Sequence, residues 1–172
     1  PRGGGFHQDL TYWGFDGTEQ VSAGLALSPA TPESGCMRMI PGSHQQGLKE
    51  QVIGEDPDNV LHLSQTIEDV NEDDAVFSTL KPGEFSLHHG WTIHSSGPNC
   101  SPDRRIGLNI QYISPRLKQT KSDSDSAMLI RGNDPFGHFI DDTPATEWLP
   151  ENAEVLLKER TEAKKVISGT PN

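Results

Sequence analysis

Short strand-like segments separated by strong turn signals run through most of the chain and limit what it can fold into. The segments are VSAGLALS, CMRMI, AVFSTL, FSLHHG, WTIHSS and RRIGLNIQYIS, with turns such as PGSH, KPGE and GPNCSPD between them. The 172 residues include 17 Gly and 13 Pro, which suits short strands and turns better than a helix bundle. The pattern predicts a mainly β protein, an antiparallel sandwich or barrel.

The length fits a single domain spanning residues 1–172. Residues 1–115 carry the strand pattern, with residues 60–67 as a weaker strand candidate. Residues 116–149 have no clear period and read as a loop or lid region. Residues 150–167 are expected to form a C-terminal helix, with Pro150 near its first turn and acidic residues ahead of Lys and Arg.

Composition disfavours several classes of partner. The formal net charge of −11 argues against nucleic acid, because a phosphate-binding surface needs clustered Lys and Arg. No apolar run approaches the roughly 20 residues that span a bilayer, so we expect no membrane partner. The two cysteines, Cys36 and Cys100, do not form a disulfide framework. Two free thiols are expected in a reducing compartment, and the predicted location is cytoplasmic.

The stretch GFHQDLTYWGF places His7 two residues before Asp9. Alternate residues of a strand share a face, so these side chains would lie side by side. An isolated H-x-D pair is more often a polar surface strand, and the interpretation therefore depends on a third ligand. With a distant histidine, the pair becomes the 2-His-1-carboxylate triad that binds non-haem Fe(II) with open positions. Of the seven histidines, only His94 lies in a segment with further site chemistry, TIHSSGPNCSPDRR.

The turn that follows His94 predicts a hairpin that brings residues 104–114 back beside it. On this returning strand one face is apolar, formed by Ile106, Leu108, Ile110 and Tyr112, and the other consists of Arg105, Gly107, Asn109 and Gln111. An arginine that begins a polar face containing glycine indicates an anion site with room for a ligand. Arg105 is therefore the candidate for binding a carboxylate, whereas Arg104 is expected to turn to solvent.

The ordered set H-Q-D, GCMRMIPGSH and HSSGPN followed by Arg resembles the phytanoyl-CoA dioxygenase family of Fe(II)/2-oxoglutarate oxygenases over residues 5–115. The resemblance implies a double-stranded β-helix (a jelly-roll, cupin-like fold) with flanking helices. It also implies residue roles. The iron ligands would be His7, Asp9 and His94; the distal carboxylate of 2-oxoglutarate would be held by Ser96 and Arg105; Trp13 would line the co-substrate or substrate pocket. For Trp13, packing in the core is an equal alternative.

The same resemblance implies the reaction. Fe(II), 2-oxoglutarate and O2 would hydroxylate an unactivated carbon of a small-molecule substrate, with release of succinate and CO2. Relatives that halogenate carry Ala or Gly at the carboxylate position, so Asp9 favours hydroxylation. The acidity of the chain disfavours a polyanion such as CoA and favours a small polar or zwitterionic metabolite. The alternative is a cupin-like metal-binding protein, an isomerase, hydrolase or binding module, that does not use 2-oxoglutarate.

Several points stay open at this level. Either His88 or His89 should face the pocket, since neighbours alternate along a strand. His44 fits a structural turn, while His62 and His138 are expected to be surface or packed residues. A metal ligand six residues from the start of the sequence is also unusual, because terminal residues fray unless a sheet holds them. The chain is therefore predicted to be a fragment that lacks the N-terminal part of a longer protein.

Overall fold

A computed structural model describes residues 3–54, 59–61, 64–144, 147 and 153–168. The chain forms two compact units. Unit 1 contains Pro1–Thr11 and Gln20–Tyr112, and unit 2 contains Tyr12–Glu19 and Ile113–Asn172. Each unit is described separately below. In the described part of the chain, no helix combines the length and apolar character that crossing a membrane requires.

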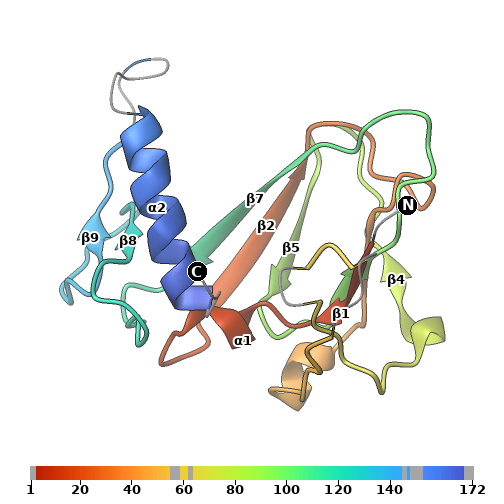
Figure 1. Cartoon of the computed structure of the whole chain (residues 1–172), viewed down its shortest axis with the longest axis horizontal. Coiled ribbons are helices and arrows are strands. Elements are labelled where there is room, and N and C mark those ends of the chain that lie inside the picture. Colours follow the sequence, from red (N-terminus) through yellow and green to blue (C-terminus); the bar gives the residue numbers. More distant parts are fainter. Residues whose placement is uncertain (1–2, 55–58, 62–63, 145–146, 148–152, 169–172) are drawn as a thin grey trace. The chain divides into compact units, whose positions relative to one another are not determined.

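Unit 1 is built on two β-sheets (Figure 1). The four-stranded sheet has the order β1 (Gly4–His7), β6 (His94–Ser96), β3 (Met37–Met39) and β4 (Val76–Phe77). The three-stranded sheet has the order β5 (Phe85–His89), β2 (Gln20–Ala26) and β7 (Gly107–Ile113). Successive strands pass repeatedly from one sheet to the other, as in a jelly roll. The prediction of a mainly β, antiparallel architecture is confirmed.

The predicted hairpin between His94 and the strand after it is wrong. Strand β6 already has a neighbour on each edge, β1 on one side and β3 on the other, so no edge is free for β7. The connecting segment instead crosses to the other sheet, where β7 lies beside β2. There the backbone N–H of Leu27 donates to the carbonyl of Ile106 at 2.9 Å.

The buried core of unit 1 lies with the four-stranded sheet. Phe6, Ile67 and Ile93 form an apolar cluster, against which Ile40, Val70 and Ala75 pack. The weaker strand candidate, residues 60–67, contributes to this cluster without forming a named strand among the described residues. Ile67 is held there because its N–H donates to the carbonyl of Phe6 at 2.7 Å. Two 3-10 turns complete the unit, Ser43–Gln46 and Glu72–Asp74.

Helix α1 (Leu10–Trp13) joins the units, and the rest of unit 2 follows β7 in the sequence. Strands β8 (Ser126–Ala127) and β9 (Ile140–Asp141) pair in parallel. The ring of Phe15 packs edge-on against Phe139, with centroids 6.1 Å apart. The C-terminal helix α2 spans Ala153–Ser168, and the predicted start at Pro150 lies outside the described residues.

Candidate metal centre

His7 and Asp9 do not share a strand, contrary to the alternation that the motif predicts. His7 is the last residue of β1, and Asp9 lies in the turn before α1. The chain leaves the strand here because Leu10, buried at the start of the helix, donates its N–H to the carbonyl of Gly90 at 3.2 Å. The turn nevertheless brings the carboxylate of Asp9 to the imidazole of His7, with 3.5 Å between Oδ1 and Nε2.

Gln8, which the sequence analysis did not single out, anchors this turn. Its side chain is fully buried. The side-chain N–H groups donate to the carbonyls of Gly47 at 2.9 Å and Trp91 at 2.8 Å, while its Oε1 accepts from the N–H of Lys49 at 2.8 Å. Because Gln8 lies between the two candidate ligands, these three hydrogen bonds restrict the positions of both. The only sequence signal for this role is its place inside the H-x-D motif.

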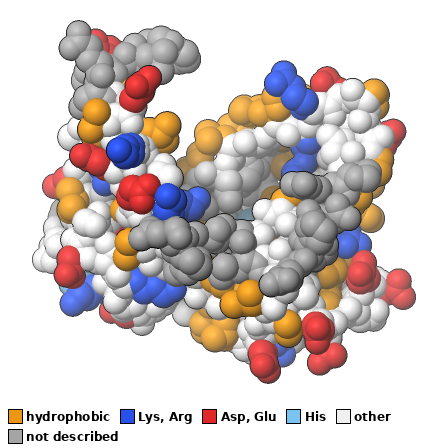
Figure 2. Space-filling model, in the orientation of Figure 1, with side chains coloured by type: hydrophobic (Ala, Val, Ile, Leu, Met, Phe, Trp, Pro, Cys, Tyr) orange, Lys and Arg blue, Asp and Glu red, His pale blue; other side chains and the backbone are white. Residues whose placement is uncertain are grey.

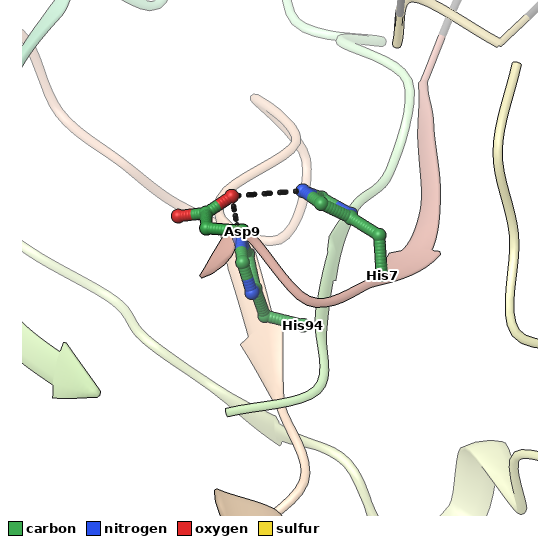
Figure 3. A group of neighbouring side chains, drawn as sticks. All are labelled: His7, Asp9 and His94. Carbon is green, nitrogen blue, oxygen red and sulfur yellow. Dashed lines mark ion pairs between the residues drawn. The ribbon is translucent and has the colours of Figure 1, made fainter. Parts of the chain in front are cut away.

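His94 reaches the same point from the neighbouring strand. It begins β6 and is the cross-strand partner of His7, and the two rings lie 4.2 Å apart. Its Nε2 is 3.7 Å from Oδ1 of Asp9. Figure 3 shows both imidazoles directed at this one carboxylate oxygen. One ligand atom from each residue lies within 4.8 Å of the other two, so the structure brings the three predicted iron ligands together.

The backbone orients both imidazoles. Nδ1 of His7 lies 2.8 Å from the carbonyl of Gly5, and Nδ1 of His94 lies 2.9 Å from the carbonyl of Thr92. A carbonyl only accepts, so each Nδ1 donates to it, and Nε2 is the nitrogen of each ring that faces the carboxylate of Asp9. Metal-binding histidines in proteins are commonly held in this way through the ring nitrogen that does not bind the metal.

The surroundings of Asp9 and His94 favour the protonation states that bind a cation. Burial alone would raise the pKa of Asp9, but interactions with His7 and His88 outweigh it and hold that pKa well below its usual range. Burial lowers the pKa of His94 to about 4. At neutral pH the site therefore offers an ionised carboxylate and a neutral imidazole. Nitrogen and oxygen donors in these states fit a divalent transition metal.

His88, rather than His89, faces the interior. Its side chain is only 3% exposed, its Nε2 lies 3.7 Å from Oδ2 of Asp9, and its ring centre is 4.8 Å from that of His94. His89 points the other way, where its Nδ1 accepts from the N–H of Trp91 at 3.1 Å and its ring lies 5.7 Å from that of His44. In the space-filling view, unit 1 is hollowed and a histidine side chain is visible at depth (Figure 2).

His138 and the two cysteines are not among the residues that form this cluster. His138 stacks on Phe136 in unit 2, with ring centres 5.6 Å apart. His62 lies outside the described residues. Cys36 is buried and Cys100 is exposed, and both are free thiols.

Arg105 lines a cavity of about 310 Å³ in unit 1 together with Met37 and Gly107. Met37 is also the cross-strand partner of Ser96, but Ser96 itself lines a different cavity, with Arg38 and Gly97. Ile106 and Leu108 also contribute to the cavity wall, so the polar and apolar faces of this strand are less cleanly separated than the sequence predicts. Arg104 precedes the strand, where its carbonyl accepts from Ser28.

Trp13 is placed in unit 2. It ends α1, and its ring packs edge-on against Phe15 with centroids 6.2 Å apart. Its carbonyl accepts a hydrogen bond from Nε2 of Gln119 at 2.9 Å. These are packing contacts, and the pocket-lining role of Trp13 stays a prediction.

Comparison with known protein sequences identifies a family. The family model described as phytanoyl-CoA dioxygenase matches residues 1–107. Phytanoyl-CoA dioxygenase 1 of Oryza sativa subsp. japonica is 36% identical over 107 residues, which is 62% of this chain and 37% of that protein. A probable alpha-ketoglutarate-dependent hypophosphite dioxygenase of Stutzerimonas stutzeri is 28% identical over 109 residues, 62% of this chain and 38% of that protein. The chain thus spans little more than a third of these relatives.

Solved structures agree with the fold. The non-heme monooxygenase ThoJ in its apo form is 29% identical, with a TM-score of 0.81 over 97% of this chain and 60% of that one. EvdO2 from Micromonospora carbonacea var. aurantiaca, complexed with 2-oxoglutarate, is 25% identical, with a TM-score of 0.59 over 70% of this chain and 48% of that one. The predicted double-stranded β-helix, the cupin-like fold of these oxygenases, is confirmed.

Proposed function

The chain belongs to the phytanoyl-CoA dioxygenase family, and from this premise we propose that it carries the Fe(II) and 2-oxoglutarate site of a dioxygenase. The enzyme hydroxylates an unactivated carbon of a small polar or zwitterionic metabolite. The observation that carries the proposal is the convergence of His7, Asp9 and His94, which come from two strands and a turn and place three donor atoms within 4.8 Å of one another.

The three donors have defined roles. Nε2 of His7, Nε2 of His94 and Oδ1 of Asp9 hold the metal, and the carbonyls of Gly5 and Thr92 keep the imidazoles oriented. When bound, Fe(II) with 2-oxoglutarate and O2 supplies the oxidative decarboxylation that yields succinate and CO2 and the hydroxylation of the substrate. The protein contributes position, burial and the exclusion of water.

Arg105 and Ser96 bind the distal carboxylate of 2-oxoglutarate in this proposal. The planar guanidinium of Arg105 matches two carboxylate oxygens, and the serine hydroxyl adds a third donor. Their support is the cavity that Arg105 and Met37 line, with Ser96 as the cross-strand partner of Met37 on β6. Gly107 leaves part of this wall without a side chain.

Asp9 favours hydroxylation over halogenation. Its carboxylate is ionised and surrounded by imidazoles. It occupies the place that a halide needs in the halogenating members of the family. The site as built therefore supports oxygen transfer to carbon.

The proposed class of substrate rests on the charge of the chain and on the names of relatives. The net charge of −11 repels a polyanion such as CoA. Among the relatives, one is described as a hypophosphite dioxygenase and another, from Gimesia maris, as a methylphosphonate hydroxylase that is 29% identical over 118 residues. These names refer to small polar molecules, and a small polar metabolite is the substrate we propose here.

The test is an anaerobic titration of the chain with Fe(II) and then with 2-oxoglutarate. We expect a weak visible charge-transfer band that depends on both additions, followed by release of succinate when oxygen is admitted. Adding a panel of small polar metabolites should raise succinate above the uncoupled background for the true substrate class. Metal binding with no response to 2-oxoglutarate would instead support a cupin-like isomerase, hydrolase or binding module.

A further inference from the structure

The two oxygens of the Asp9 carboxylate have different neighbours. Oδ1 is approached by the metal-binding nitrogens of His7 at 3.5 Å and His94 at 3.7 Å. Oδ2 points to the three-stranded sheet, where Oγ of Ser22 lies at 3.5 Å and Nε2 of His88 at 3.7 Å. The carboxylate is thus enclosed by four groups, two on each oxygen.

Ser22 is prepared to donate to Oδ2. Its Oγ accepts a hydrogen bond from Nε2 of Gln20 at 3.0 Å, so its own proton is available for Asp9. Ser22 is fully buried, and Gln20 is 2% exposed. Ser22 is also the cross-strand partner of His88, which places both donors on the same side of the carboxylate.

His88 differs from the two metal-binding histidines. Within the described residues, neither of its ring nitrogens has a hydrogen-bond partner, and no carbonyl holds its Nδ1 as Gly5 and Thr92 do for the others. A buried polar group left unpaired destabilises the fold, so its presence needs a reason. Its distance from Oδ2 exceeds a hydrogen bond, and such bonds often tighten when an active site is occupied.

We propose that His88 and Ser22 are positioning residues that bind Oδ2 of Asp9, so that Oδ1 alone faces the metal. A carboxylate held in this way contributes one ligand atom and leaves a further position on the metal open for the reactants. The inference rests on the proposed function, since it assumes that a metal binds at His7, Asp9 and His94. It assigns to β2 and β5 a role in the geometry of ligands that lie outside those strands.

The experiment is a titration of the whole chain with Co(II), which has visible bands that weaken as its coordination number rises. We expect His88→Leu and Ser22→Ala each to weaken Co(II) binding by about 10-fold or more, as for other residues behind metal ligands. Both should also weaken the visible bands, because Oδ2 is then free to bind the metal. His88→Gln keeps an N–H donor and should restore both properties. Ser86→Ala removes a hydroxyl from the same strand and serves as the control.

Thermal unfolding of the metal-free variants gives a second readout. Because His88 also interacts with the buried carboxylate of Asp9, His88→Leu should lower the melting temperature of the metal-free chain and His88→Gln should recover it. A single cooperative transition in each variant separates a loss of Co(II) binding from a loss of fold. Wild-type Co(II) affinity in His88→Leu would overturn the inference and leave the metal site intact. A loss in His88→Gln as large as in His88→Leu would make His88 a ligand and also overturn it. Failure of the wild-type chain to bind Co(II) would refute the proposed function itself, and the inference with it.

Discussion

The two sheets of unit 1 contribute differently to the site. The four-stranded sheet carries His7 and His94 as a cross-strand pair and packs against the apolar cluster that contains Ile67. The three-stranded sheet carries none of the three candidate ligands, but its inner face presents Ser22 and His88 to the carboxylate. The comparison indicates that the two candidate imidazole ligands belong to the better-packed sheet, where small displacements are most strongly resisted, while Asp9 lies in the turn that follows β1.

The two sheets also differ in how well their apolar side chains are covered. The face of the three-stranded sheet opposite Ser22 and His88, here called its outer face, is the exposed one. Its register pairs Ala23 with Leu87 and Leu25 with Phe85, so apolar side chains line one face. Phe85 and Leu87 are each 59% exposed, which means that no described residue covers them fully. This face therefore adds less to stability than the cluster on the four-stranded sheet, and the two sheets can be tested against each other.

The largest expected effect is on the four-stranded sheet. His94→Ala removes a proposed metal-binding nitrogen and should weaken Co(II) or Fe(II) affinity by roughly 1000-fold, more than the ~10–100-fold typical of residues behind the ligands. The matched control is His89→Ala, which removes an imidazole of the three-stranded sheet that points away from the carboxylate of Asp9. Equal losses in the two variants, measured by metal titration, would remove the distinction between the sheets.

The second prediction concerns stability. Ile67→Ala creates a cavity in the buried cluster and should lower the free energy of unfolding by about 2–4 kcal/mol. Leu87→Ala, on the exposed outer face, should cost less than about 1 kcal/mol. Urea denaturation of the two variants measures both values. A cost for Leu87→Ala as large as that for Ile67→Ala would show that the outer face is covered in solution.

The smallest expected effect concerns the co-substrate. Arg105→Ala loses a charge-assisted, two-pronged contact and should weaken 2-oxoglutarate binding by about 10–100-fold, with metal affinity unchanged. Arg104→Ala should change 2-oxoglutarate binding little, because Arg105 lines the cavity and Arg104 is not among its lining residues. Titration with 2-oxoglutarate under anaerobic conditions, read from the charge-transfer band, compares the two. The reverse order would assign the anion site to Arg104.

Much of the site was predictable because it depends on residue types with few alternatives. An imidazole two residues before a carboxylate, with a second imidazole in a segment rich in Ser, Gly and Arg, narrows the chemistry to a mixed nitrogen and oxygen metal site. Strand positions were also readable, since the expected segment 21–28 contains most of β2 (Gln20–Ala26). The anchor Gln8 was not, because a glutamine in a sequence gives no sign of which carbonyls it will meet.

The sequence by itself determined the mainly β character, the three candidate ligands and the arginine that follows them, because periodicity, turn residues and side-chain chemistry are local properties. Only the tertiary structure decided that Asp9 lies in a turn, that β7 joins β2, and that His88 faces inward. Each of these depends on a partner distant in sequence. The turn at Asp9 depends on the carbonyl of Gly90, which accepts a hydrogen bond from the N–H of Leu10. The place of β7 depends on the strands that occupy both edges of β6, and the direction of His88 depends on the carboxylate of Asp9 beside it. A strand's free edge and a side chain's neighbours exist only once the sheets have assembled, which is why local pattern could not reveal them.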